Sequence, residues 1–135
     1  MDENELLARF GLVPAATDLA EIRQLITASI ADDGRDSNEP LKTLCVQLFS
    51  AGNPDDALLI YKAKTSSFDA DCYIDIQLVC GAGLEPTKAF LFGSSEPQAK
   101  ELLASLQNSV SAGDFDDFTP ERQLDVYRHY YGLSP

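Results

Sequence analysis

Apolar residues recur three and four positions apart along most of this chain, which is the spacing of one face of an α-helix. The longest such stripe consists of Ala99, Leu102, Leu103, Leu106 and Val110. It predicts a helix over residues 96–112, ended by Gly113. A similar stripe between Leu41 and Phe49 predicts a helix that stops before Gly52.

Helix start signals extend this pattern, because Ser, Thr, Asp and Asn favour the N-cap and Pro favours the first turn. Further helices are predicted over residues 3–10, from Thr17 to Ile30, from Asn53 to Lys64, between Gly83 and Gly93, and from Thr119 to Tyr131. The stretch 31–40 has no apolar periodicity and is dense in turn-forming residues. It is therefore predicted to be the longest surface loop.

Residues 72–80 fit two patterns. Ile74, Ile76 and Leu78 alternate with polar residues, as in a strand, whereas Ile76 also shares a helical stripe with Val79 and Cys80. We interpret the segment as a helix, because a single strand would have no neighbour with which to pair its backbone groups.

A related phrase ends three of the predicted helical segments. Each phrase begins at a glutamine, Gln47, Gln77 or Gln107, and ends in Ala-Gly, and the glutamines are 30 residues apart. The sequence therefore predicts a single all-α domain over residues 1–135, with six to eight helices in a short, α-solenoid-like stack of antiparallel hairpins. An irregular helical bundle is the alternative, because it would also place glycines after its helices.

Over residues 41–131 this arrangement resembles the α-hairpin repeat proteins, HEAT-like or tetratricopeptide-like, although 30 residues is shorter than their usual unit. The run from Ile74 to Leu84, with its continuation to Leu91, also looks like segments of small bacterial all-α proteins. That second resemblance implies a bacterial origin, where small acidic helical proteins often serve as immunity partners of toxins. It assigns no functional residue.

The net charge limits the classes of partner that the protein is expected to bind. The chain carries 22 Asp and Glu against 10 Lys and Arg, a formal net charge of −12. This excess argues against nucleic acid and anionic membranes as partners, since both require clustered cations. The acidic N-terminus and the lack of a long apolar run predict a cytoplasmic protein. We therefore expect a non-catalytic protein-binding module with an acidic surface for a basic protein partner, such as a bacterial immunity or adaptor protein.

Acids and aromatics alternate near the C-terminus, and tyrosines beside charged rims are common in binding hot spots. The candidate partner-binding residues are Asp114, Phe115, Asp116, Asp117, Phe118 and Tyr130. On the last helix, Tyr127 and Tyr131 share the face of Leu124 and are predicted to be core, which leaves Tyr130 exposed.

Catalytic and metal-binding patterns are missing from the sequence. The one histidine, His129, falls in the last turns of the final helix, where it complements the helix dipole. The three cysteines, Cys45, Cys72 and Cys80, form no C-x-x-C pair and are expected to be buried free thiols. No catalytic residue, cofactor or metal site is predicted.

Two other functions remain open at this point. One is an enzyme or metal-binding protein that uses a cluster of acids, such as Asp69, Asp71 and Asp75. The other is a structural homo-oligomer, for example a homodimer, that associates through Phe90, Phe92 or the terminal aromatics.

Overall fold

The computed structural model describes residues 1–32 and 37–133, and these residues form eight α-helices, three 3₁₀ helices and no strand. The α-helices are α1 (Glu3–Phe10), α2 (Leu19–Ala31), α3 (Glu39–Ser50), α4 (Ala57–Lys64), α5 (Phe68–Tyr73), α6 (Leu84–Phe92), α7 (Pro97–Ser111) and α8 (Pro120–Tyr130). The 3₁₀ helices are Ala16–Asp18, Pro54–Asp56 and Ile76–Cys80. The prediction of an all-α fold with six to eight helices is confirmed.

The ends of the predicted polar loop over residues 31–40 are helical in the structure. α2 continues through Ala31, and α3 begins at Glu39. Of the residues between them, 33–36 lie outside the described part of the chain.

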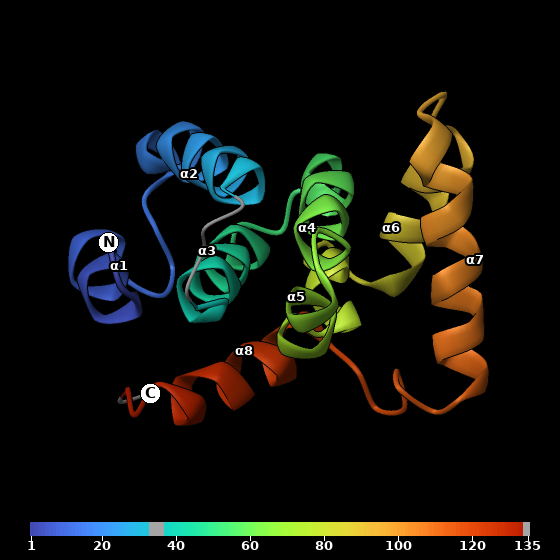
Figure 1. Cartoon of the computed structure of the whole chain (residues 1–135). Helices are drawn as coiled ribbons and strands as arrows, with labels where there is room; N and C mark the ends of the chain where they lie inside the picture. Colours follow the sequence, from blue (N-terminus) through green and yellow to red (C-terminus); the bar gives the residue numbers. More distant parts are fainter. Residues whose placement is uncertain (33–36, 134–135) are drawn as a thin grey trace.

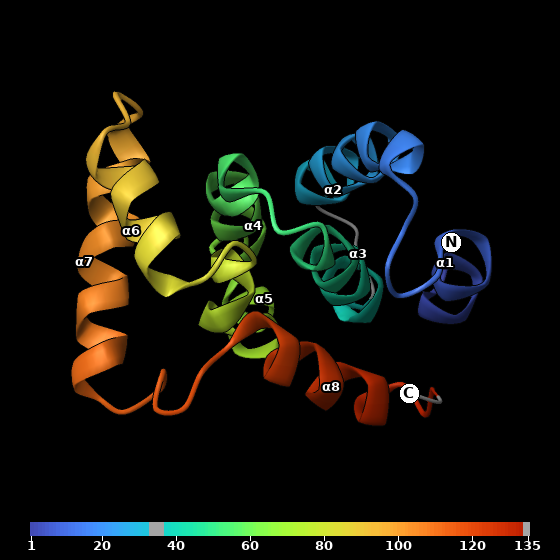
Figure 2. The same ribbon diagram turned by 180° about the vertical axis from the view of Figure 1, so that it is seen from behind.

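Helix α3 is the centre of the N-terminal part of the fold. It lies between α1 and α2 on one side and α4 on the other, with α8 beneath it in the view of Figure 1. The same arrangement is seen from behind in Figure 2. Every residue from 41 to 49 is buried, because helices surround α3 on all sides. Its sequence matches this position, since it is apolar there except for Lys42, Thr43 and Gln47.

The buried polar side chains of α3 bind neighbouring helices. Gln47 Nε2 donates hydrogen bonds to the carbonyl oxygens of Leu6, at 3.0 Å, and Gly11, at 2.9 Å. Thr43 Oγ1 lies 2.9 Å from the hydroxyl of Tyr131. These contacts hold α1 and the end of α8 against α3, and they pair the Gln47 amide nitrogen and the Thr43 hydroxyl, which would be costly to bury alone.

An ion pair joins α2 to the start of α4. The guanidinium of Arg23 donates from Nε and Nη2 to the two carboxylate oxygens of Asp56, at 2.8 and 3.1 Å. Asp56 is only 6% exposed, and this bidentate pair offsets the free-energy cost of burying its charge.

Helix ends follow the start and stop signals of the sequence. The N-cap Thr119 accepts a hydrogen bond from the backbone N–H of Arg122, and Asn53 accepts one from the N–H of Asp55. The glycines that end the three related phrases share positive φ angles, which are 70° at Gly52, 105° at Gly83 and 91° at Gly113.

The side chains of the three repeated glutamines have different environments. Gln47 is buried against α1, whereas Gln77 donates from Nε2 to the carbonyl oxygen of Asp114 at 2.8 Å. Gln107 is exposed on α7. The repeat is thus shared in backbone geometry at the glycines and not in the side-chain contacts of the glutamines.

The order of the helices in space combines both predicted arrangements. α6 and α7 form an antiparallel hairpin, as expected for a stack of hairpins (Figure 1). α8 instead returns along the molecule and packs on α3, far earlier in the chain (Figure 2). A linear stack brings together mainly sequential neighbours. The α3–α8 contact is therefore the feature expected of the irregular bundle.

The prediction of one continuous helix over residues 72–80 is wrong. α5 ends at Tyr73, and Ile74 and Asp75 are extended, with ψ angles of 115° and 140°, before the 3₁₀ helix begins at Ile76. Lys64 Nζ donates to the carbonyl oxygens of Asp71 and Ile74 at the break. A continuous helix would have used both carbonyls in its own backbone hydrogen bonds.

Candidate functional site

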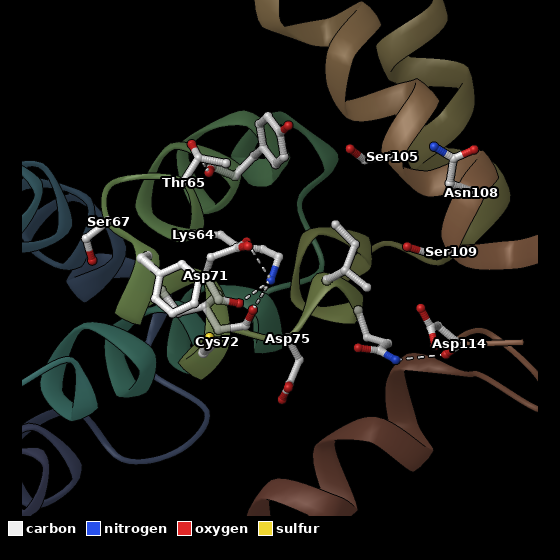
Figure 3. Close-up of a pocket in the computed structure, with 15 residues that line it drawn as sticks. Lys64, Thr65, Ser67, Asp71, Cys72, Asp75, Ser105, Asn108, Ser109 and Asp114 are labelled. Atoms are coloured by element: carbon white, nitrogen blue, oxygen red, sulfur yellow. Dashed lines mark hydrogen bonds and ion pairs between the residues drawn. The ribbon is translucent and has the colours of Figure 1, made fainter. Parts of the chain in front are cut away.

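A cleft of about 820 Å³ lies between α4 and α5 on one side and α7 on the other (Figure 3). Part of its lining comes from the 3₁₀ helix Ile76–Cys80 and from the connection between α7 and α8. Among the described residues, its charged lining consists of Asp71, Asp75, Asp114 and Lys64. The cleft therefore has the same negative excess as the whole chain.

Lys64 stabilises the α5 side of the cleft. Its Nζ donates to the carbonyl oxygens of Asp71, at 2.7 Å, and Ile74, at 2.6 Å, and lies 3.1 Å from Asp71 Oδ1 (Figure 3). Its side chain is only 15% exposed. The one cation of the lining is thus occupied within the protein, which leaves the mouth of the cleft acidic.

Helix α5 projects its side chains outward beside this cleft. Of its six residues, all of them described, Ala70 alone is buried. Phe68 is 83% exposed and Tyr73 is 44% exposed, and Asp69, Asp71 and Cys72 are exposed between them. We define these residues, 68, 69 and 71–73, as the α5 ridge.

The sequence analysis did not identify the α5 ridge as a binding surface. Its signal is the run FDADCY, in which two aromatics enclose two acids, much as in the C-terminal segment. The sequence analysis names Asp69 and Asp71 only as part of a cluster of acids for an enzyme or metal-binding protein, and does not join them with Phe68 and Tyr73.

The opposite wall of the cleft is polar. Ser105, Asn108 and Ser109, spaced as one face of α7, line it. Tyr61 joins α4 to α7, because its hydroxyl donates a hydrogen bond to Glu101 Oε2 at 2.7 Å. Burial, with this hydrogen bond adding to it, raises the pKa of Tyr61 above its usual value.

The structure separates the six candidate residues into four locations. Asp114 is exposed and lines the cleft. Phe115 is buried, only 8% exposed, and packs edge to face on the half-buried Phe118 at a centroid distance of 5.1 Å. Phe115 therefore belongs to the core and not to a binding surface, because the turn before α8 directs it inward. Asp116 and Asp117 are exposed in that turn, where Asp117 has a φ of 57°.

Tyr130 lies on another part of the surface, where α8 meets α3. It is 52% exposed, and its hydroxyl donates to both carboxylate oxygens of Glu39, at 2.9 and 3.0 Å. Lys42 Nζ lies 4.4 Å from the centre of its ring, a cation–π distance. Burial and the Glu39 carboxylate raise the pKa of Tyr130 to about 12. The prediction that Tyr130 is exposed while Tyr127 is core is confirmed.

One hydrogen-bond network connects the cleft with α8. The hydroxyl of Tyr127, which is 1% exposed, donates to Asp75 Oδ2 at 2.5 Å. Burial, with the charge of Asp75 adding to it, raises the pKa of Tyr127 well above its usual value. Lys42 Nζ lies 3.9 Å from the same Asp75 oxygen. Asp75 thus serves both as cleft lining and as an anchor of α8.

The three thiols differ in accessibility. Cys45 and Cys80 are buried, and burial raises the pKa of each to about 12. Cys72 is exposed on the α5 ridge and lines the cleft. The expectation that all three are buried is therefore wrong for Cys72, because α5 projects away from the core.

In residues 1–32 and 37–133, no group of three or more His, Cys, Asp or Glu side chains is arranged to hold a metal ion. His129 is exposed, and its Nδ1 lies 2.9 Å from the carbonyl oxygen of Asp125 in the preceding turn of α8.

Fold and cleft together define an all-α protein with an open acidic cleft that has the exposed ring of Phe68 in its lining. Comparison of the chain with protein-family models, with curated proteins and with solved structures finds no match. Within the described part of the chain, every helix is too short or too polar to cross a membrane.

Proposed function

We propose that this protein is a non-catalytic protein-binding module whose acidic surface engages a basic protein partner. The observation that carries the proposal is the α5 ridge beside the cleft, where exposed Phe68 and Tyr73 lie among carboxylates. Aromatic anchors supply buried area at an interface, and carboxylates around them select a cationic partner.

The charge of the chain supports the same function. With a formal net charge of −12, the protein attracts cationic surfaces over a distance set by the ionic strength. Such steering accelerates association more than it deepens affinity. A module of this kind serves as an adaptor, which holds a basic protein, or as an immunity protein, which covers the working surface of a basic toxin.

The test begins with identification of the partner in the native host by affinity capture. The purified partner is then mixed with the protein at increasing salt, and the association rate constant is measured by stopped flow. We expect the rate constant to fall by about tenfold or more between low salt and roughly 0.5 M salt. An association rate that does not change with ionic strength, or a partner without a cationic surface, would overturn the proposal.

Phe92 favours a second candidate function, self-association through α6. Its side chain is 84% exposed, whereas Phe90 is partly buried against the core. Light scattering over a range of protein concentrations, with Phe92→Ser as the comparison, tests this function. A monomer at every concentration excludes it.

A further inference from the structure

We infer that the cleft receives an extended segment of the partner and that an arginine of this segment packs on Phe68 with its guanidinium facing the cleft carboxylates. This inference rests on the proposed function and specifies the chemistry of the segment that the site recognises. Three observations support it: the polar α7 wall, the unbalanced charge of the cleft, and the exposed aromatic ring at its rim.

The α7 wall favours an extended segment over a helix. Ser105, Asn108 and Ser109 present hydroxyl and amide groups to the cleft (Figure 3). A partner helix satisfies its own backbone hydrogen bonds and needs an apolar groove for its apolar stripe. An extended segment has free backbone N–H and C=O groups, and these match the donors and acceptors of the wall.

The carboxylates of the cleft favour a cationic side chain supplied by the partner. Lys64 is already bound by two carbonyl oxygens and the Asp71 carboxylate. One oxygen of Asp75 accepts from Tyr127 and lies 3.9 Å from Lys42 Nζ, which leaves its other oxygen and the Asp114 carboxylate for a further cation. The Asp75 side chain is still 41% exposed, and Asp114 is exposed at the opposite edge. A cationic side chain entering the cleft would therefore meet carboxylates that have oxygens left to accept hydrogen bonds.

The exposed ring of Phe68 favours arginine over lysine. A side chain that is 83% exposed leaves its ring face open to solvent and to a partner. A guanidinium stacks on such a ring while its N–H groups remain directed at carboxylates, whereas a lysine ammonium is more strongly hydrated and lacks the planar fork.

Cys72 provides a direct measure of occupancy, because it is the exposed thiol of the described cysteines and lines the cleft. The experiment measures the rate at which iodoacetamide, a neutral reagent, alkylates Cys72. The probes are three short blocked peptides of glycine and serine that contain two arginines, two lysines or two citrullines. We expect the arginine peptide to slow alkylation at saturation by about tenfold, the lysine peptide to bind more weakly, and the citrulline peptide to have no effect.

Two variants test the assigned contacts. Phe68→Ala and Asp114→Asn change exposed side chains, so the fold should be retained, and each should weaken binding of the arginine peptide about threefold to fivefold. Glu85→Gln removes an exposed carboxylate of α6 outside the cleft lining and is the matched control, with less than a twofold effect expected.

The outcomes separate this inference from the proposed function. If the natural partner binds with a salt-dependent rate but neither variant weakens it and Cys72 remains fully reactive, the cleft is not the site, and the inference is wrong while the proposed function stands. Equal protection by the arginine and citrulline peptides would also overturn the inference. If neither the basic peptides nor any basic partner binds, both proposals fail.

Discussion

Gly81 lies where the 3₁₀ helix Ile76–Cys80 meets the end of α3, and its substitution tests how closely these two segments pack. A Cβ added to Gly81 would lie 2.4 Å from the carbonyl oxygen of Phe49, a backbone atom of α3. No real Cβ approaches a backbone atom so closely, and a backbone carbonyl cannot rotate away as a side chain could. In Gly81→Ala, one of the two segments must therefore move.

The magnitude follows from two opposing effects. Gly81 has φ −59° and ψ −29°, which alanine adopts easily, so the loss of unfolded-state freedom would by itself stabilise the protein by about 0.4–1 kcal/mol. Overpacking of a well-packed core costs roughly 1–3 kcal/mol. We expect a net loss of about 1–2 kcal/mol, which for 135 residues corresponds to a Tm lowered by about 4–7 °C.

Thermal and urea unfolding followed by circular dichroism measure this effect, and Gly93→Ala is the matched control. Gly93 also has a helical backbone conformation, with φ −87° and ψ −1°. The nearest atoms to its added Cβ are at 3.7 and 3.9 Å, which are ordinary contacts. Gly93→Ala should therefore be neutral or slightly stabilising. If Gly81→Ala is as stable as Gly93→Ala, the close approach of the 3₁₀ helix to α3 is wrong.

Three further predictions concern the thiols, the α8 anchor and alkaline pH. In the native protein Cys72 alone should react rapidly with a thiol reagent, and denaturant should release the two buried cysteines; two fast thiols without denaturant would contradict the burial. Tyr127→Phe removes the hydrogen bond to the partly exposed Asp75 and should cost about 1–2 kcal/mol in urea unfolding, whereas a loss under about 0.3 kcal/mol would show that this bond does not anchor α8. The folded-state pKa of Tyr130, raised to about 12, lies above the unfolded value of about 10, so its contribution to stability is complete below pH of about 10 and is lost as the pH rises through 12. Difference absorbance between the wild type and Tyr130→Phe measures this titration, and a midpoint near 10 would refute it.

The local pattern of apolar and capping residues determined that the fold is helical and where most helices end. The spacing of apolar residues places Tyr127 inside and Tyr130 outside α8, because a helix turns by a fixed angle per residue. Thr119 and Asn53 act as N-caps because their side chains accept hydrogen bonds from N–H groups only two or three residues away. Net charge is likewise a property of composition, and with it came the expectation of a basic partner.

Tertiary contacts decided the rest, because they join residues that the sequence leaves far apart. The break after α5 depends on Lys64, which binds the carbonyl oxygens of Asp71 and Ile74 from the neighbouring helix. Before that break α5 leaves Phe68 and Cys72 exposed, which the local sequence FDADCY does not by itself reveal.

The candidate site also depends partly on the sequence and partly on the tertiary structure. Its chemistry, aromatics among acids, was visible in the sequence, but its place was not. Phe115 is core and Asp114 lines the cleft, although the two are adjacent in the chain, because the turn before α8 directs one side chain inward and the other outward. The sequence by itself thus determined which elements form and which charge they carry. Only the packing of α3, α5, α7 and α8 decided which of those side chains share a surface, because that depends on contacts between segments distant in the chain.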